Sequence, residues 1–223
     1  MIAIPMPAPI ILYDPTEVQM GGRTGRQEAL HLANNRGIPV ANVLEIPLFG
    51  SRNYLNVLHN GNVIIITHGN LATGFATASQ RTRGPNRNRV TAAQMCRTLA
   101  STGLLRDRTL AYRFELLICQ SASGNNTFAR QFYDEMRARV ADIRVKASPG
   151  SISISRGGEL SVTYFTIQQT SSLFTAPVRL AAFSLMSPLR FISNRLPELP
   201  ENPISSYNIM LHDWVFYPSG TEF

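Results

Sequence analysis

Two short motifs in the sequence hold residues that can carry out nucleophilic chemistry. His68 and Gly69 follow the apolar run 63–67, and Cys119 follows the apolar run 114–118. In an open α/β sheet the carboxyl ends of parallel strands share one crevice, so we expect the imidazole and the thiol to face each other there. An imidazole can take the thiol proton, and the resulting thiolate is the nucleophile. The spacing therefore predicts Cys119 as nucleophile and His68 as general base.

Gly69 gives the same site a way to stabilise negative charge. Because it has no side chain, a substrate carbonyl can approach its backbone closely. We expect the N–H groups of Gly69 and Cys119 to bind the oxyanion, where loss of one donor typically costs about 3–4 kcal/mol. Taken singly, Cys119 fits a small buried residue and His68 a core histidine. The combination of the two motifs favours catalysis.

Alternating strand and helix patterns are expected to position these residues. Unbroken apolar runs and amphipathic stretches predict strands over 10–13, 63–67, 112–119 and 143–147, and helices over 26–35, 91–102 and 128–139. Because parallel neighbours need crossover connections, this order predicts an α/β fold, a three-layer α-β-α sandwich with a mostly parallel central sheet.

Further elements are expected after this core. Alternation over 151–155 and 160–165, around Arg156, predicts a β-hairpin flap, and 207–217 is apolar enough to dock back as a strand. Residues 70–90, which hold the arginines from Arg81 to Arg89, are expected to form a mobile surface loop. We assign residues 1–170 to a catalytic domain and 171–223 to a C-terminal extension that packs on it.

Composition excludes several classes of function. The net charge is +7, with Lys146 as the sole lysine, and arginine side chains of this number suit an anionic partner. The basic residues are scattered without interleaved aromatic residues, which argues against nucleic acid. The run 63–66 is far shorter than the roughly 20 apolar residues of a membrane-spanning helix. The four histidines and two cysteines show no zinc-ligand spacing, so we expect no metal.

Cysteine usage and the first residues suggest where the protein is made. Two cysteines in 223 residues do not form a disulfide framework, which favours a reducing compartment, and Cys96 fits packing inside a helix. The first nine residues contain three prolines and lack the basic start of a signal peptide. We therefore expect synthesis in the cytoplasm without a cleavable signal, which is compatible with secretion into a host or target cell by a specialised apparatus.

The motifs around His68 and Cys119 resemble those of caspase-like (clan CD) cysteine peptidases, and within them the autoprocessing cysteine peptidase domain of bacterial toxins and related secreted effectors. A His-Gly pair ends one strand in that group, and a cysteine ends the next. The resemblance covers about residues 60–165. The stretches that carry it are 66–69 (ITHG), 90–95 (VTAAQM), 117–121 (LICQS), 128–132 (FARQF) and the hairpin around 156–158 (RGG).

The resemblance implies a Cys–His dyad that cleaves a protein substrate and needs no cofactor for its chemistry. In the toxin domains inositol hexakisphosphate binds a basic site near the flap and activates the enzyme. Arg23, Arg26, Lys146 and Arg156 are the candidates for that site here. The loop with Arg81–Arg89 and the residues after 170 have no counterpart, so a stand-alone effector that acts in trans fits better than a self-cleaving module. The alternative is a catalytically inactive caspase-like binding or adaptor module that engages an acidic partner. The sequence predicts no oligomeric state.

Overall fold

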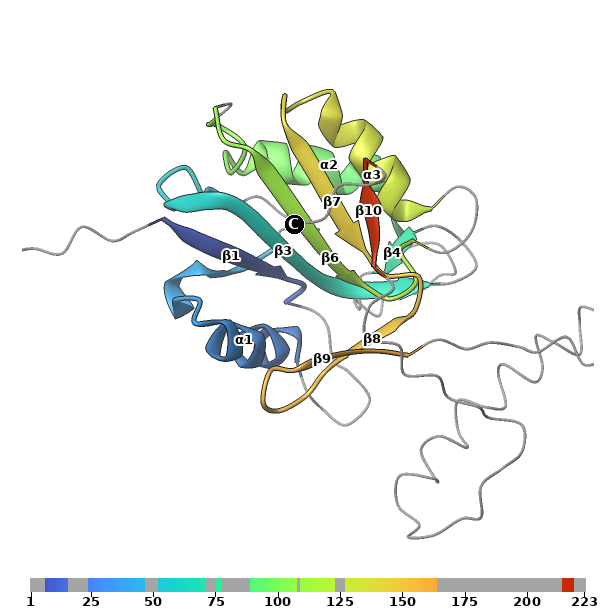
Figure 1. The fold of residues 1–223 in the computed structure, drawn as a ribbon. Coiled ribbons are helices and arrows are strands. Elements are labelled where there is room, and N and C mark those ends of the chain that lie inside the picture. The colour runs from blue at the N-terminus through green and yellow to red at the C-terminus, as the bar shows by residue number, and fades with distance from the viewer. Residues whose placement is uncertain are drawn as a thin grey trace, which may run out of the picture. The chain divides into compact units, whose positions relative to one another are not determined.

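A β-branched strand, β3 (His59–Asn70), runs through the middle of the main sheet in the computed structural model (Figure 1). The structure describes residues 7–15, 24–46, 52–70, 75–77, 89–107, 109–122, 127–163 and 214–218. Residues Val63 to Ile66 are each at most 4% exposed. Burial on both faces of the sheet explains why this run is apolar without alternation.

The main sheet is mostly parallel. Its strand order is β10-β7-β6-β3-β1-β2, and only the pairing of β10 with β7 in this row is antiparallel. The other strands of the row are β1 (Ala8–Tyr13), β2 (Val43–Glu45), β6 (Tyr112–Ile118), β7 (Ile143–Ala147) and β10 (Val215–Tyr217). The expectation of an α/β fold with a mostly parallel sheet is confirmed.

Three helices begin at threonine caps. In α1 (Gly25–Arg36) and α2 (Ala92–Ser101) the cap hydroxyl accepts from the backbone N–H of a glutamine three residues on, whose side chain accepts from the cap N–H in return. In α3 (Phe128–Arg137) the hydroxyl of Thr127 accepts from the Arg130 N–H at 3.0 Å. These caps satisfy donors that have no partner within the helix, which explains why each helix starts where it does.

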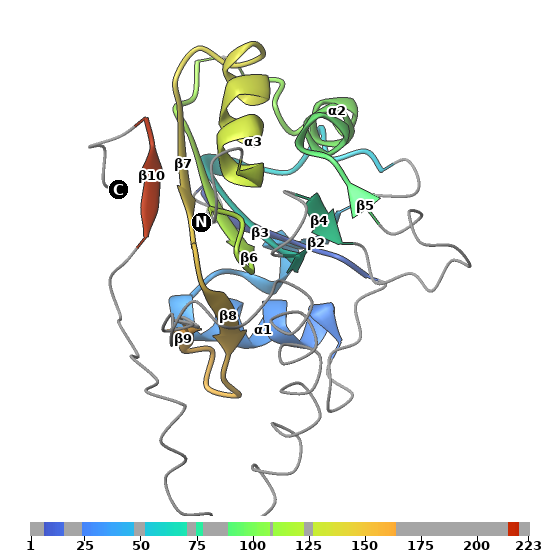
Figure 2. The same ribbon diagram turned by 90° about the vertical axis from the view of Figure 1, so that its right-hand side faces the viewer.

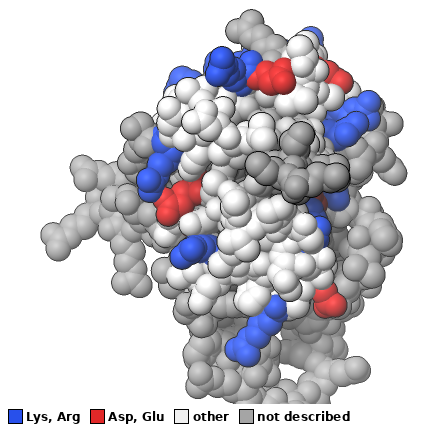
Figure 3. All heavy atoms as spheres, turned by 90° about the vertical axis from the view of Figure 1, so that its left-hand side faces the viewer, with Lys and Arg blue, Asp and Glu red and all other residues white. Residues whose placement is uncertain are grey.

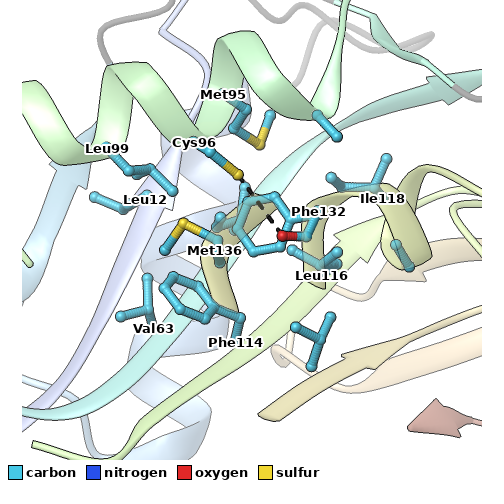
Figure 4. Close-up of a cluster of buried hydrophobic side chains, with 14 of the residues drawn as sticks. Leu12, Val63, Met95, Cys96, Leu99, Phe114, Leu116, Ile118, Phe132 and Met136 are labelled. Atoms are coloured by element: carbon cyan, nitrogen blue, oxygen red, sulfur yellow. Dashed lines mark hydrogen bonds between the residues drawn. The ribbon is translucent and has the colours of Figure 1, made fainter. Parts of the chain in front are cut away.

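The helices cover opposite faces of the sheet (Figure 2). α2 and α3 cover one face, where Met95, Phe114 and Phe132 belong to the larger hydrophobic cluster. Cys96 is fully buried in this cluster with its sulfur 3.8 Å from the Phe132 carbonyl oxygen (Figure 4). α1 covers the other face, over a smaller cluster that includes Ile66 and Leu117. Side-chain alternation along the strands divides the core between the two faces.

An antiparallel hairpin of β8 (Ser151–Ile154) and β9 (Leu160–Thr163) lies on the α1 side of the sheet (Figure 2). Its tip is bound to α1, because the Asn35 Nδ2 donates to the Gly157 carbonyl at 3.1 Å. Gly158 has φ 79°, and an added Cβ would stand 2.8 Å from the His31 carbonyl carbon. Only glycine tolerates both that backbone angle and that proximity, so the tip is seated closely on the helix.

Some elements differ from expectation. The loop expected over 70–90 contains two short strands, β4 (Phe75–Thr77) and β5 (Arg89–Val90), which pair with each other, and β4 also pairs with β3. Strand β2 and a short 3₁₀ helix (Val40–Asn42) before it were not predicted. Of the last strand, predicted over 207–217, residues 207–213 lie outside the described residues, and β10 covers Val215–Tyr217. Most of residues 171–223 lie outside the described residues, so the domain boundary stays a prediction.

The described residues all belong to one compact unit. None of the helices among them is long and apolar enough to cross a bilayer.

Candidate functional site

His68 lies on β3, and Cys119 directly follows the neighbouring parallel strand β6. The pairing of β3 with β6 runs in register up to Thr67 and Ile118, and the residues that come next along the chain are His68 and Cys119. Neighbouring strands lie about 4.8 Å apart. The carboxyl ends of the two central strands therefore bring the imidazole-bearing and thiol-bearing residues together.

Their side chains also project from the same face of the sheet. Side chains two residues apart along a strand share a face. Ile66 and Leu117, two residues before His68 and Cys119, both belong to the cluster under α1. The Cys119 sulfur contacts Ile152 of the hairpin, which packs against that same cluster. The imidazole and the thiol thus occupy the side of the sheet covered by α1 and the hairpin.

Gly69 brings the two strand ends unusually close. A Cβ added at Gly69 would stand 2.9 Å from the Cys119 carbonyl carbon and 2.9 Å from Ile118 Cγ2, and nearer still to the Cys119 carbonyl oxygen. Real Cβ atoms keep farther away than this from their neighbours. The close approach needs a residue without a side chain, so the packing of the strand ends explains a glycine at position 69 independently of the predicted oxyanion role. That role stays a prediction.

The backbone around Cys119 is held in a sharp turn. Gln120 has φ 60°, a left-handed value that residues with a side chain seldom adopt. The turn is bound to the connection between β7 and β8, because the Gln120 N–H donates to the Gly150 carbonyl at 2.8 Å and the Ala122 N–H to the Ser148 carbonyl at 3.1 Å. Strained backbone of this kind gathers at functional sites and persists where surrounding bonds enforce it.

The hairpin reaches the sulfur directly. The backbone N–H of Ile152 donates to Cys119 Sγ at 3.2 Å, and Sγ lies 3.6 Å from the Ile152 carbonyl oxygen. A thiolate accepts a hydrogen bond from an N–H group more strongly than a thiol does, because the acceptor then carries a full charge. The hairpin therefore holds the sulfur in place, with an N–H donor for a thiolate and a carbonyl acceptor for a thiol.

His68 lies beside two buried carboxylates that the sequence analysis did not identify. Burial lowers the pKa of His68 below its usual value of 6.5, while the charges of Asp14 and Glu28 act to raise it. Asp14 is 1% exposed and Glu28 is 2% exposed. The Asp14 N–H donates to the Ile66 carbonyl at 3.2 Å, which fixes Asp14 next to β3. The result is an imidazole that is neutral near pH 7 and has acidic residues near it.

The position of Asp14 in the sequence could have identified it as a site residue. It directly follows β1, as Cys119 directly follows β6, so the rule that parallel strands gather functional residues at their carboxyl ends applies to it equally. Glu28 had no such signal, because it lies in the first turn of α1 and only the packing of that helix buries it.

Of the four residues predicted to bind inositol hexakisphosphate, the three that the structure describes lie in different places. Arg23 lies outside the described residues. Arg26 is in the first turn of α1, about 15 Å along the helix axis from Arg36 at its end. Arg156 is exposed at the hairpin tip. Lys146, on β7, forms an ion pair at 3.2 Å with Glu115, which Arg36 also contacts. Lys146 therefore lies toward the far end of α1 from Arg26.

The site offers acid–base and nucleophilic groups rather than a metal-binding set. In the part of the chain that the structure describes, His, Cys, Asp and Glu side chains form no group of three that could hold a metal ion. A thiol, a neutral imidazole and buried carboxylates on one face suit acyl transfer. No family model matches the chain, and no curated protein matches its sequence significantly.

Proposed function

We propose that the protein is a cysteine peptidase of the caspase-like kind, with Cys119 as nucleophile and His68 as general base. The observation that supports this most directly is that the two residues directly follow paired positions on adjacent parallel strands and share one face of the sheet. A neutral imidazole beside a thiol is the arrangement that generates a thiolate.

The proposed reaction has two halves. The Cys119 sulfur attacks the carbonyl carbon of a peptide bond, and its proton passes to His68. The carbonyl oxygen becomes an oxyanion, stabilised by backbone N–H groups of Gly69 and Cys119. Collapse breaks the C–N bond, and the departing amine takes the proton from His68, which leaves a thioester. Water, deprotonated by His68, then attacks the thioester and releases the acid and the thiol.

Asp14 extends the dyad toward a triad in this proposal. A carboxylate near an imidazole stabilises the imidazolium that forms during the reaction and holds the ring in orientation. Asp14 is buried and raises the pKa of His68 against the lowering effect of burial. We assign Asp14 a positioning role, because it acts on the substrate only through His68.

Selective labelling of Cys119 tests the proposal. The full chain is treated with a peptidyl chloromethyl ketone, with and without inositol hexakisphosphate, and the modified cysteine is mapped by mass spectrometry. We expect Cys119 to react and Cys96 to be spared, with the rate falling strongly in His68→Ala. Proteome-wide cleavage by the wild-type protein is then compared with that by Cys119→Ala.

Two results would contradict the proposal. Equal labelling of Cys119 in His68→Ala and wild type would show that the imidazole does not activate the thiol. Identical cleavage patterns from wild type and Cys119→Ala would show that the cysteine is not the nucleophile, and would favour a non-catalytic binding module instead. A faster reaction with inositol hexakisphosphate would support activation by that ligand.

A further inference from the structure

A basic groove lies on the α1 side of the sheet, toward the amino ends of β6 and β7. It has a volume of about 690 Å³, and its lining includes four cations, Arg36, Arg113, Arg144 and Lys146, with Glu115 as the acid among them. Basic side chains also cover more of the described surface than acidic ones in the view of Figure 3. We call this feature the Arg113–Arg144 groove.

One carboxylate, that of Glu115, already lies in the groove and shows that its cations bind carboxylates. Arg36 contacts both carboxylate oxygens of Glu115, at 2.5 and 3.1 Å, and Lys146 contacts one of them at 3.2 Å. Burial alone would raise the pKa of Glu115, but the hydrogen bonds and charges of Arg36 and Lys146 outweigh it and hold the pKa below its usual value. Glu115 therefore supplies the counter-charge for Arg36 and Lys146.

The other two cations have no counter-charge in an ion pair among the described residues. Arg113 and Arg144 are directly paired in the register of β6 and β7, and neither forms an ion pair within the described part of the chain. The Nε of Arg113 is buried and has no hydrogen-bond partner among the described residues. Like charges opposite each other on neighbouring strands repel, so an anionic group between them would relieve the repulsion and fill the open donor.

We propose that the Arg113–Arg144 groove binds an acidic segment of a partner protein, with a carboxylate between the two guanidinium groups. The rest of the lining favours a peptide over a polyphosphate, because Pro9, Ile38 and Ile64 also line the groove. Apolar lining suits the side chains that flank an acidic residue in a peptide, whereas it offers nothing to a ligand that carries charge on every side.

The groove is separate from the Cys119 site. Arg113 and Cys119 are six residues apart along β6 and the residue that follows it, which corresponds to about 20 Å. The inference therefore does not rest on the proposed peptidase activity. Binding is measured with Cys119→Ala, so that the peptide stays intact whether or not the protein is an enzyme.

Fluorescence anisotropy tests the groove. The probe is a fluorescein-labelled peptide of alternating leucine and glutamate, titrated with the full chain at low ionic strength. We expect saturable binding that weakens as salt is added, and a loss of about tenfold or more in affinity for Arg113→Gln/Arg144→Gln and, to a smaller extent, for Arg144→Gln alone. Arg130→Gln is the matched control, because Arg130 is exposed on α3 and pairs with Asp134 at 3.0 Å.

Further arms keep the result independent of folding defects in the variants. A peptide of alternating leucine and glutamine, tested on the unaltered groove, is expected to bind at least tenfold more weakly than the glutamate peptide. Equal binding of the two peptides, or equal binding by the double variant and the control, overturns the proposal. Binding of inositol hexakisphosphate in the groove without any binding of the glutamate peptide also overturns it, in favour of a phosphate site.

Discussion

Replacement of Gly69 by alanine probes the close approach of β3 and β6 most directly. The new Cβ would stand 2.9 Å from Ile118 Cγ2 and 2.9 Å from the Cys119 carbonyl carbon. Carbon atoms pack best at about 3.5–4.0 Å, so the strand ends must separate by about 1 Å. Overpacking of this kind costs about 1–3 kcal/mol of folding free energy. A shift of about 1 Å at a reacting group can lower the rate about a hundredfold.

The assay has two readouts. Urea unfolding gives the loss of stability, and the second-order rate of Cys119 alkylation by a peptidyl electrophile gives the loss of reactivity. We expect Gly69→Ala to fold with reduced stability and to lose most of its labelling rate. Gly157→Ala is the control, because an added Cβ there meets only Ser155 Oγ at 3.6 Å, an ordinary contact. Wild-type stability and labelling rate in Gly69→Ala would refute the inferred closeness of the strand ends.

Three further predictions concern titratable groups. Burial raises the pKa of Cys96 to about 12, so iodoacetamide at pH 8 should modify Cys119 in the native protein and reach Cys96 only after denaturation, as peptide mapping will show. Burial lowers the pKa of His68, so the rate of Cys119 labelling should decline only at a pH below the usual histidine pKa. Asp14→Asn removes a charge that raises the pKa of His68, so this decline should move to lower pH. A move to higher pH would contradict the role assigned to Asp14. The pKa of Glu115 is lowered in the folded state, so its stabilising effect is present above the usual glutamate pKa and is lost as the pH falls through the folded value. Glu115→Gln keeps one oxygen acceptor but loses the charge, so it should cost about 1–3 kcal/mol at pH 7 in urea unfolding. A difference that fails to shrink in acid would count against this reading.

The sequence predicted the elements whose signals are local. Apolar runs marked the central strands, and threonine caps such as Thr91 marked helix starts. The positions of His68 and Cys119 at strand ends followed from the same pattern, because the rule that joins them depends only on parallel strand order. Strands β2, β4 and β5 have three residues or fewer, too short for any periodicity to show.

Contacts set by tertiary packing could not be predicted. The alternation in β7 suggests that Arg144 and Lys146 share a face, but only the register with β6 places Arg144 opposite Arg113. The bond from the Ile152 N–H to the Cys119 sulfur joins residues 33 positions apart and depends on where the hairpin lands. Burial of Glu28 likewise requires the docking of a whole helix.

Strand β10 shows how a segment distant in the sequence protects one edge of the sheet. It covers the side of β7 away from β6, with the Tyr217 hydroxyl 3.1 Å from Thr127 Oγ1 and the Tyr217 ring stacked on Tyr133. A three-residue strand followed by Pro218, which has no N–H, offers little for another molecule to pair with. A chain cut before residue 214 would instead expose the five-residue edge of β7 and would be prone to self-association. Protein yield and solubility should therefore depend on the few residues of β10.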